Sequence, residues 1–228
     1  MPPRSRRFAL LVALPLCLAL VLWPVAQHYQ ARARARAATL ELRAAINRDF
    51  GGRGYLSLAR VAPLLQVGGD VNVRGINQMT MLHCLAMRLG SPPALQATDS
   101  ESARATLTRY LLAHGADPDA YAPRNGLMRN TPLMVAALHA RSQVVAALLQ
   151  GGANANVDKS ENEKPGPNGK KEVRTALTIA RETLDDLKAT DITTDDVSSS
   201  PRELREYKTN LSEAQRTVAL LQAATTHH

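Results

Sequence analysis

Histidine and cysteine are the side chains of this sequence best suited to chemistry, because imidazole can act as a base and a thiol as a nucleophile. His83 and Cys84 are neighbours in the chain. Adjacent residues on a helix point about 100° apart, so these two side chains are not expected to face each other. His114 and His139 have no cysteine or carboxylate at metal-ligand spacing. The sequence therefore predicts no catalytic residue and no metal site.

The stretch Gly-Gly-Arg-Gly at residues 51–54 is the one glycine-rich segment that invites comparison with a phosphate-binding loop. Such a loop ends in Lys followed by Ser or Thr, which this stretch lacks. We interpret it as a simple loop and expect no cofactor. Together with the absence of a catalytic pair, this predicts that the protein is not an enzyme.

Positive charge is concentrated at the N-terminal end of the chain. The 228 residues carry a formal net charge of +8. Residues 1–60 contain ten arginines against Glu41 and Asp49, whereas residues 61–228 contain 18 basic and 18 acidic residues. A nucleic-acid-binding domain should carry its basic face on the folded part. The distribution therefore argues against a nucleic-acid partner and points to membrane topology instead.

The composition favours helices. Hydrophobic residues make up 45% of the chain but aromatic residues only 4%, so a core must be built from Ala, Leu and Val. Such side chains suit closely packed helices better than a sheet, which favours β-branched and aromatic residues. We expect one all-α domain with an appendage. Cys17 and Cys84 give no disulfide framework.

The appendage is an uncharged segment at residues 8–26, which follows a basic tail at residues 1–7. As a helix it would be about 28 Å long, close to the hydrocarbon thickness of a bilayer. A secretory signal peptide shares this layout, yet its apolar region usually has about 7–15 residues. We therefore favour an uncleaved membrane anchor, with a cleaved signal as the alternative.

The order of tail and apolar segment also indicates an orientation. A short basic tail directly before the apolar run is typical of an export signal whose N-terminus stays inside the cell. Arg32, Arg34 and Arg36 on the far side nearly balance the tail, so the positive-inside rule adds little. We expect the main domain at the outer face of a bacterial inner membrane, in the periplasm.

Two short patterns recur along the rest of the chain. A Leu-Leu pair followed by Gly and then Asp or Asn occurs at residues 64–72, 111–119 and 148–156. A Thr-led apolar pattern occurs at residues 80–86 and 131–137, with a weaker copy at 175–180. Thr is a favoured helix N-cap, and Gly just past the Leu-Leu pair is typical of a helix that ends through a left-handed residue. Each copy thus predicts a pair of helices followed by a tight turn.

In this order the motifs resemble the ankyrin repeat. Residues 131–157 (TPLMVAALHARSQVVAALLQGGANANV) follow the family pattern almost throughout, and residues 80–120 match it at both ends. His83 stands where the family has the histidine of its Thr-Pro-Leu-His turn, so the resemblance implies that it hydrogen-bonds backbone.

The resemblance implies a solenoid of about three repeats with an N-terminal cap, over residues 55–223. We expect the cap at residues 55–73 and the last helix at 213–223. The family repeats about every 33 residues, whereas Gly68 and Gly115 lie 47 residues apart. We assign the excess to loops. The remaining predicted segments are a linker helix at residues 27–54, inserted loops at 88–105, 158–174 and 185–202, and a tail at 224–228.

Ankyrin repeats generally bind other proteins through their turn tips and the exposed side of each first helix. Carried over to this chain, the tips are residues 74–78, 121–129 and 158–174. Tyr, Arg and Met are residue types that interfaces favour. The predicted partner-binding residues at the second tip are Tyr121, Arg124, Asn125, Met128 and Arg129. On the first helices the predicted positions are Cys84, Arg88, Val135, Leu138 and His139.

The favoured function is a protein-binding module, monomeric on its own, at the outer face of the inner membrane. It would act as an immunity protein that inhibits a toxic effector, or as a helper of a periplasmic enzyme. One alternative is a cytoplasm-facing scaffold that recruits proteins to the membrane. Another is an enzyme with an unrecognised site in the inserted loops.

Overall fold

The computed structural model describes residues 4–50, 56–87, 100–122, 130–157, 174–189 and 201–226, and side chains from residue 22 onward, except at 201–203. Within these ranges every regular element is a helix, which confirms the predicted all-α class. The elements are α1 (Arg4–Phe50), α2 (Leu58–Gln66), the 3-10 turn η1 (Ile76–Gln78), α3 (Met81–Ala86), α4 (Glu101–Ala113), α5 (Pro132–Leu138), α6 (Ser142–Gln150), α7 (Ala176–Ala189) and α8 (Pro201–Thr226).

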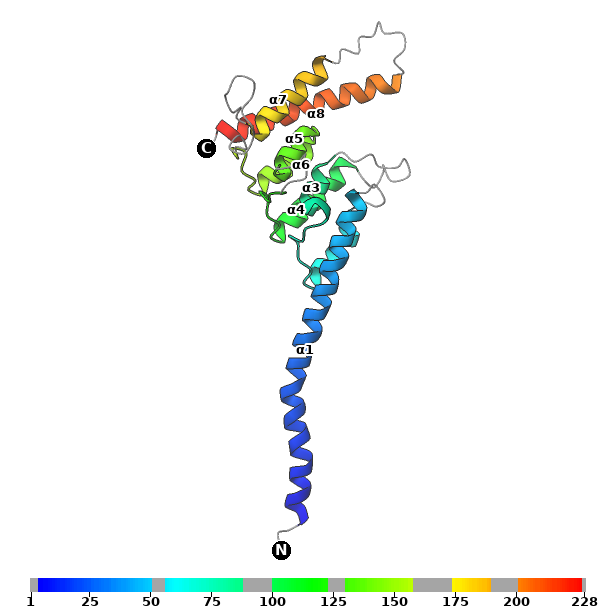
Figure 1. The fold of residues 1–228 in the computed structure, drawn as a ribbon, viewed down its shortest axis with the longest axis vertical. Coiled ribbons are helices and arrows are strands. Elements are labelled where there is room, and N and C mark those ends of the chain that lie inside the picture. The colour runs from blue at the N-terminus through cyan, green and yellow to red at the C-terminus, as the bar shows by residue number, and fades with distance from the viewer. Residues whose placement is uncertain are drawn as a thin grey trace.

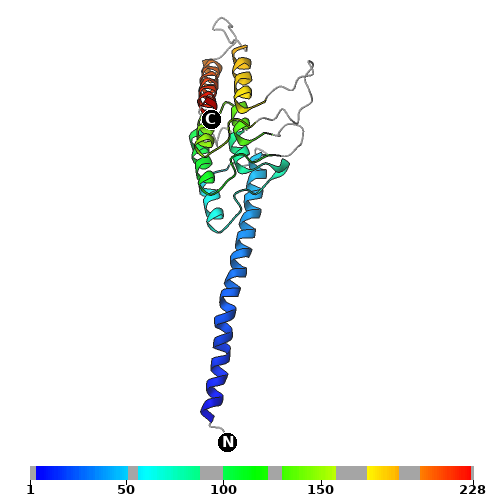
Figure 2. The ribbon, with the colours of Figure 1, turned by 90° about the vertical axis from the view of Figure 1, so that its left-hand side faces the viewer.

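The helices stack in two rows. The end of α1, then α3, α5 and α7 contact one another in sequence along one row, and α2, α4, α6 and α8 form the other. Each unit is a hairpin with one helix in each row, and the hairpins lie side by side as a short solenoid (Figure 1; Figure 2). This arrangement is the one that the repeat pattern implied.

Helix α1 differs from the predicted linker. It runs for 47 residues and extends away from the stack as a single rod, with only its C-terminal end against the other helices (Figure 1). Ala38, Leu42 and Ile46 are buried there, at the four-residue spacing that places side chains on one helix face. The end of α1 is therefore the first helix of the cap unit, and the packed domain begins before residue 55.

The membrane prediction falls mainly on residues whose side chains are not described. Within the part of the chain open to this test, no helix is both long enough and apolar enough to cross a bilayer. The basic tail at residues 1–7, and residues 8–21 of the uncharged segment, have no described side chains.

The predicted helix ends are confirmed. Thr131 is the N-cap of α5, and its Oγ1 accepts a hydrogen bond from the Met134 N–H at 3.4 Å. Gly68, Gly115 and Gly152 have φ of +90°, +83° and +89°, the left-handed conformation that only glycine adopts without strain. In each case the two residues after the helix donate N–H groups back to its last carbonyls.

The inserted loops are shorter than predicted where the structure describes them. Helix α4 begins inside the predicted loop 88–105, and its N-cap Ser100 accepts a hydrogen bond from the Ala103 N–H. Helix α7 continues through residues 185–189, and α8 is one helix from residue 201 to 226, which includes most of the predicted tail. Polar residues on the exposed faces hid the apolar stripes of these helices. Residues 158–173 of the predicted loop at 158–174 lie outside the described residues.

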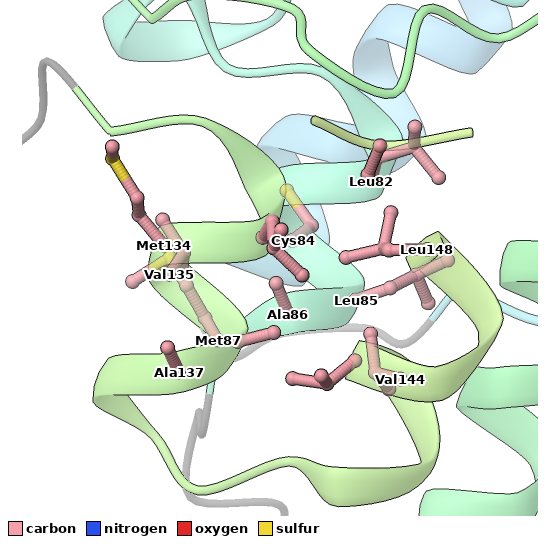
Figure 3. Packing of buried hydrophobic residues seen from close by; sticks show 14 of the residues in the cluster. Leu82, Cys84, Leu85, Ala86, Met87, Met134, Val135, Ala137, Val144 and Leu148 are labelled. Carbon is pink, nitrogen blue, oxygen red and sulfur yellow. The ribbon is translucent and has the colours of Figure 1, made fainter. Parts of the chain in front are cut away.

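The core lies between the two rows. Leu82, Leu85 and Ala86 of α3 meet Val144 and Leu148 of α6, as the close view shows (Figure 3). Aliphatic and methionine side chains fill this cluster, while Phe50 and Tyr110 pack only at its edge. A core of small aliphatic side chains is what the composition predicted.

Candidate protein-binding surface

His83 is a structural residue rather than a catalytic one. It is completely buried. The Thr80 N–H donates to its Nδ1 at 3.3 Å, and its Nε2 lies 2.9 Å from the carbonyl oxygen of Asn130. Because Nδ1 accepts from a backbone N–H, the ring proton is on Nε2 and is donated to Asn130. The expectation that His83 hydrogen-bonds backbone is confirmed.

Cys84 lies beside His83 but has no access to solvent. Burial raises the pKa of its thiol, and the negative charge of Asp49 raises it further. The guanidinium of Arg104 acts in the opposite direction with a smaller effect. The thiol is thus held in its neutral form, which is a poor nucleophile.

The buried side chain of Arg104 closes the C-terminal end of α3. Its Nη1 donates to the carbonyl oxygens of Cys84 at 3.0 Å and of Leu85 and Met87 at 3.4 Å. A six-residue helix leaves its last carbonyls without helical partners, and a charged donor satisfies several of them at once. Among the residues that the structure describes, no group of three or more potential ligands could hold a metal ion.

The turns that follow the second-row helices are joined by side chains of the Asp/Asn motif. Asn72 Oδ1 accepts the N–H of Asp117 at 2.8 Å, and Asn72 Nδ2 donates to the Gly115 carbonyl at 3.0 Å. One unit later, Asp119 Oδ1 accepts the N–H of Asn154 at 2.9 Å. These bonds fix the spacing of successive turns and keep the tips that follow them in register.

The first turn tip is held by hydrogen bonds and exposes an apolar side chain. Asn77 and Gln78 have φ of 56° and 59°, which costs of order 1 kcal/mol or more for each non-glycine residue. The tip is held by bonds from the Gly75 N–H to the Met79 carbonyl and from the Ile76 N–H to Asn47 Oδ1. The Ile76 side chain is 52% exposed.

Arg74 joins the first tip to the second. Its Nη1 donates to the Gln78 carbonyl at 3.0 Å and also to the carbonyl of Tyr121, whose side chain is 36% exposed. Arg43 of α1 in turn donates to the Arg74 carbonyl at 3.1 Å. We call the exposed set Ile76, Asn77, Gln78 and Tyr121 the tip surface.

The sequence predicted Tyr121 as an individual site residue, and Ile76, Asn77 and Gln78 only as part of the turn tip at residues 74–78. Tyr121 was predicted from its type. Ile76 was not singled out within its tip, although a lone apolar residue between Gly75 and Asn77 in a turn was an available signal. The hydrogen bonds of Arg74 depend on residues 47 positions apart, which no local pattern reveals.

The predicted contact residues of α5 differ in their exposure. Val135 was predicted as a contact residue but is 0% exposed, because it lies in the core cluster between α5 and α3 (Figure 3). The same packing buries Cys84. Leu138 is 40% exposed and His139 is half-buried at the C-terminal end of the helix. The predicted contacts Arg88, Arg124, Asn125, Met128 and Arg129 lie outside the described residues.

Comparison with known families agrees with the hairpin geometry. Residues 128–160 match the family model of the ankyrin repeat. The match contains α5, α6 and the left-handed Gly152 turn. No curated protein matches the sequence.

Proposed function

We propose that this chain, whose residues 128–160 match the ankyrin-repeat family, binds one protein partner through the tip surface and the exposed end of α5. The observation that carries this proposal is the preformed tip, in which Ile76 and Tyr121 are presented on backbone held by Arg74 and Asn47. A binding surface that is ordered beforehand loses little conformational entropy when the partner arrives. The side chains of His83 and Cys84 are buried, so they cannot contact the partner.

We propose that the protein does not catalyse a reaction. His83 and Cys84, the adjacent pair considered for catalysis, lie inside the core and serve in packing and in a bond between units. Ankyrin repeats are generally non-enzymatic binding modules. The partner would be a toxic effector that the protein inhibits or an enzyme that it assists.

We further propose that residues 8–26 anchor the module in a membrane. The support is the length and lack of charge of this segment and the aromatic residues at its end. Trp23 and Tyr29 are 68% and 67% exposed on α1, and aromatic side chains are enriched where a helix leaves the bilayer. The repeats would face the periplasm. A cytoplasm-facing scaffold is the second candidate, because the near balance of arginines around the segment does not fix its orientation.

Site-specific photocrosslinking in living cells tests the binding surface. A benzophenone amino acid replaces Ile76, Tyr121 or Leu138, one at a time. These exposed side chains do not support the core. The expected result is an adduct to the same protein from all three positions, identified by mass spectrometry.

The controls carry the same photoreactive group at Arg109 of α4 and Arg205 of α8, which are exposed in the other row of helices. Adducts that form equally at the control positions, or only there, contradict a partner at the tip surface. A C-terminal alkaline phosphatase fusion separates the two orientations, since the enzyme is active only outside the cytoplasm. An inactive fusion favours the scaffold.

A further inference from the structure

A section of α1 projects from the repeats without touching them. Every residue from 22 to 34 is exposed, and Ala35 is the first that is partly covered. The section is nevertheless helical throughout, as part of one uninterrupted helix. Its side chains are therefore available to something outside the repeat domain.

The exposed section carries one sign of charge. Arg32, Arg34 and Arg36 lie within five residues, and residues 22–40 contain no Asp or Glu. At 100° per residue, Arg32 and Arg36 share one side of the helix while Arg34 points to the opposite side. The three guanidinium groups thus surround α1 instead of forming a stripe, which suits a planar layer of ligands around the helix.

Along the helix the arginines lie just beyond the headgroup layer of a bilayer, if the hydrocarbon ends at Ala26. With a rise of about 1.5 Å per residue, Arg32 lies about 9 Å beyond Ala26, and Arg36 lies about 15 Å beyond it. The headgroup layer is about 5–8 Å thick on each side of the hydrocarbon. Long arginine side chains reach back toward such a layer. Trp23 lies at the hydrocarbon end of the section.

The first repeat unit would lie just above this layer. The turn after α2 runs alongside α1, since a Cβ placed on Gly68 would be 3.3 Å from the Cβ of Ala35. Val67 in this turn is half-exposed. The repeat domain thus meets α1 at Ala35, and residues 26–34 lie exposed between the domain and the proposed bilayer.

We infer that Arg32, Arg34 and Arg36 form a collar that binds the phosphate groups of anionic phospholipids at the membrane surface. This inference rests on the proposed insertion of residues 8–26. Guanidinium groups bind phosphate through paired N–H donors, and the collar has no neighbouring carboxylate to compete for them. The charge complementarity selects an anionic lipid surface as the occupant.

Trp23 makes the inference testable, because it is the single tryptophan of the chain. The full-length protein is reconstituted into phosphatidylcholine vesicles that also contain phosphatidylglycerol. Energy transfer from Trp23 is measured to dansyl-labelled phosphatidylglycerol and, separately, to dansyl-labelled phosphatidylcholine. We expect greater transfer to the anionic lipid, and an excess that decreases as salt is added.

The test variants replace Arg32, Arg34 and Arg36 by Gln, singly and together. An arginine near an anionic surface contributes about 1 kcal/mol, so each replacement should lower the preference for phosphatidylglycerol about fivefold. The matched control makes the same change of charge on the last unit, with Gln at Arg181, Arg205 and Lys208, which are all exposed. We expect this control to retain the full preference.

Acrylamide quenching of Trp23 distinguishes a failure of the proposed membrane anchor from a failure of the collar alone. If acrylamide quenches Trp23 as strongly with vesicles as without them, residues 8–26 do not insert, and the anchor and the collar are both overturned. If Trp23 is protected but the triple arginine variant keeps its preference for phosphatidylglycerol, the collar alone is overturned. A loss of preference in the control variant as large as in the collar variant also overturns it.

Discussion

The imidazole of His83 joins two units of the solenoid, because its Nε2 donates to the carbonyl oxygen of Asn130, 47 residues further along the chain. The other ring nitrogen accepts the Thr80 N–H at the start of the same helix. One side chain therefore bonds both to the beginning of α3 and to the backbone segment that precedes α5. The histidine of the repeat motif is a connector between units in this protein.

Replacement of this connector is expected to destabilise the fold. The variant His83→Ala loses the bonds to Thr80 and Asn130, removes this donor from the partly buried Asn130 carbonyl and creates a cavity, at a cost of about 2–4 kcal/mol. Urea denaturation followed by circular dichroism measures the change in the free energy of unfolding. His114→Ala is the control, because His114 is exposed and bonds only within its own helix end. An equal loss in both variants contradicts the role given to His83.

Arg104 should contribute to stability through the three carbonyl groups that it meets. In Arg104→Leu these carbonyls lose a charged donor inside the protein, and we expect a loss of about 2–4 kcal/mol. Arg109→Leu removes the same charge from the exposed side of the same helix, and surface changes of this kind usually stay within about 0.5 kcal/mol. Thermal unfolding of the two variants measures both losses of stability. Equal losses would show that the removed charge, and not the buried contacts of Arg104, accounts for the effect.

The Cys84 thiol should make stability depend on alkaline pH. Its pKa is raised in the folded state above the ordinary value of 9.0, so the unfolded chain releases this proton first. The contribution is fully present below pH 9 and declines above it, with a slope that approaches about 1.4 kcal/mol per pH unit. The variant Cys84→Ala should lack this part of the slope. Identical pH profiles of the free energy of unfolding for the two proteins are the contrary outcome.

Asn72 should protect a single backbone amide in the neighbouring unit. In Asn72→Ala the Asp117 N–H loses its acceptor and the Gly115 carbonyl loses a donor, so we expect about 1–2 kcal/mol of destabilisation. Hydrogen exchange observed by NMR should show the largest acceleration at Asp117. Asn156→Ala, at an exposed position two units further along, should leave this amide unchanged. Acceleration spread evenly over all turns argues against a specific bond.

Features that depend on neighbouring residues were predictable from the sequence. Thr131 caps α5, and Gly152 ends α6, because the N–H and carbonyl groups involved lie within six residues of each other. The Ala-, Leu- and Val-rich composition likewise predicted a helical core. These rules act over one turn of helix, so a single sequence contains all that they need.

Features that depend on the packing of distant units were not predictable from the sequence. Val135 has the type and position of a contact residue, and its burial is decided by the helices around it. In α1 the spacing of Ala38, Leu42 and Ile46 is that of a packed helix face, but the repeat motifs placed the start of the cap at residue 55. The bond from Arg74 to the Tyr121 carbonyl joins two turns whose contact only the folded chain creates.

The uninterrupted course of α1 sets an angular phase between its two ends. Ile46 and Asp49 are buried, and Asp49 Oδ1 accepts the N–H of Leu56, so the C-terminal end cannot turn within the domain. One residue inserted between positions 27 and 34 would therefore rotate the whole solenoid by about 100° about the helix axis and lift it by about 1.5 Å. Seven inserted residues would return the solenoid to within about 20° of its original orientation about the helix axis, displaced by roughly 10 Å along that axis. The length of this segment thus determines how far Ile76 and Tyr121 lie from the N-terminal end of α1. It also determines the direction in which they face around the helix axis.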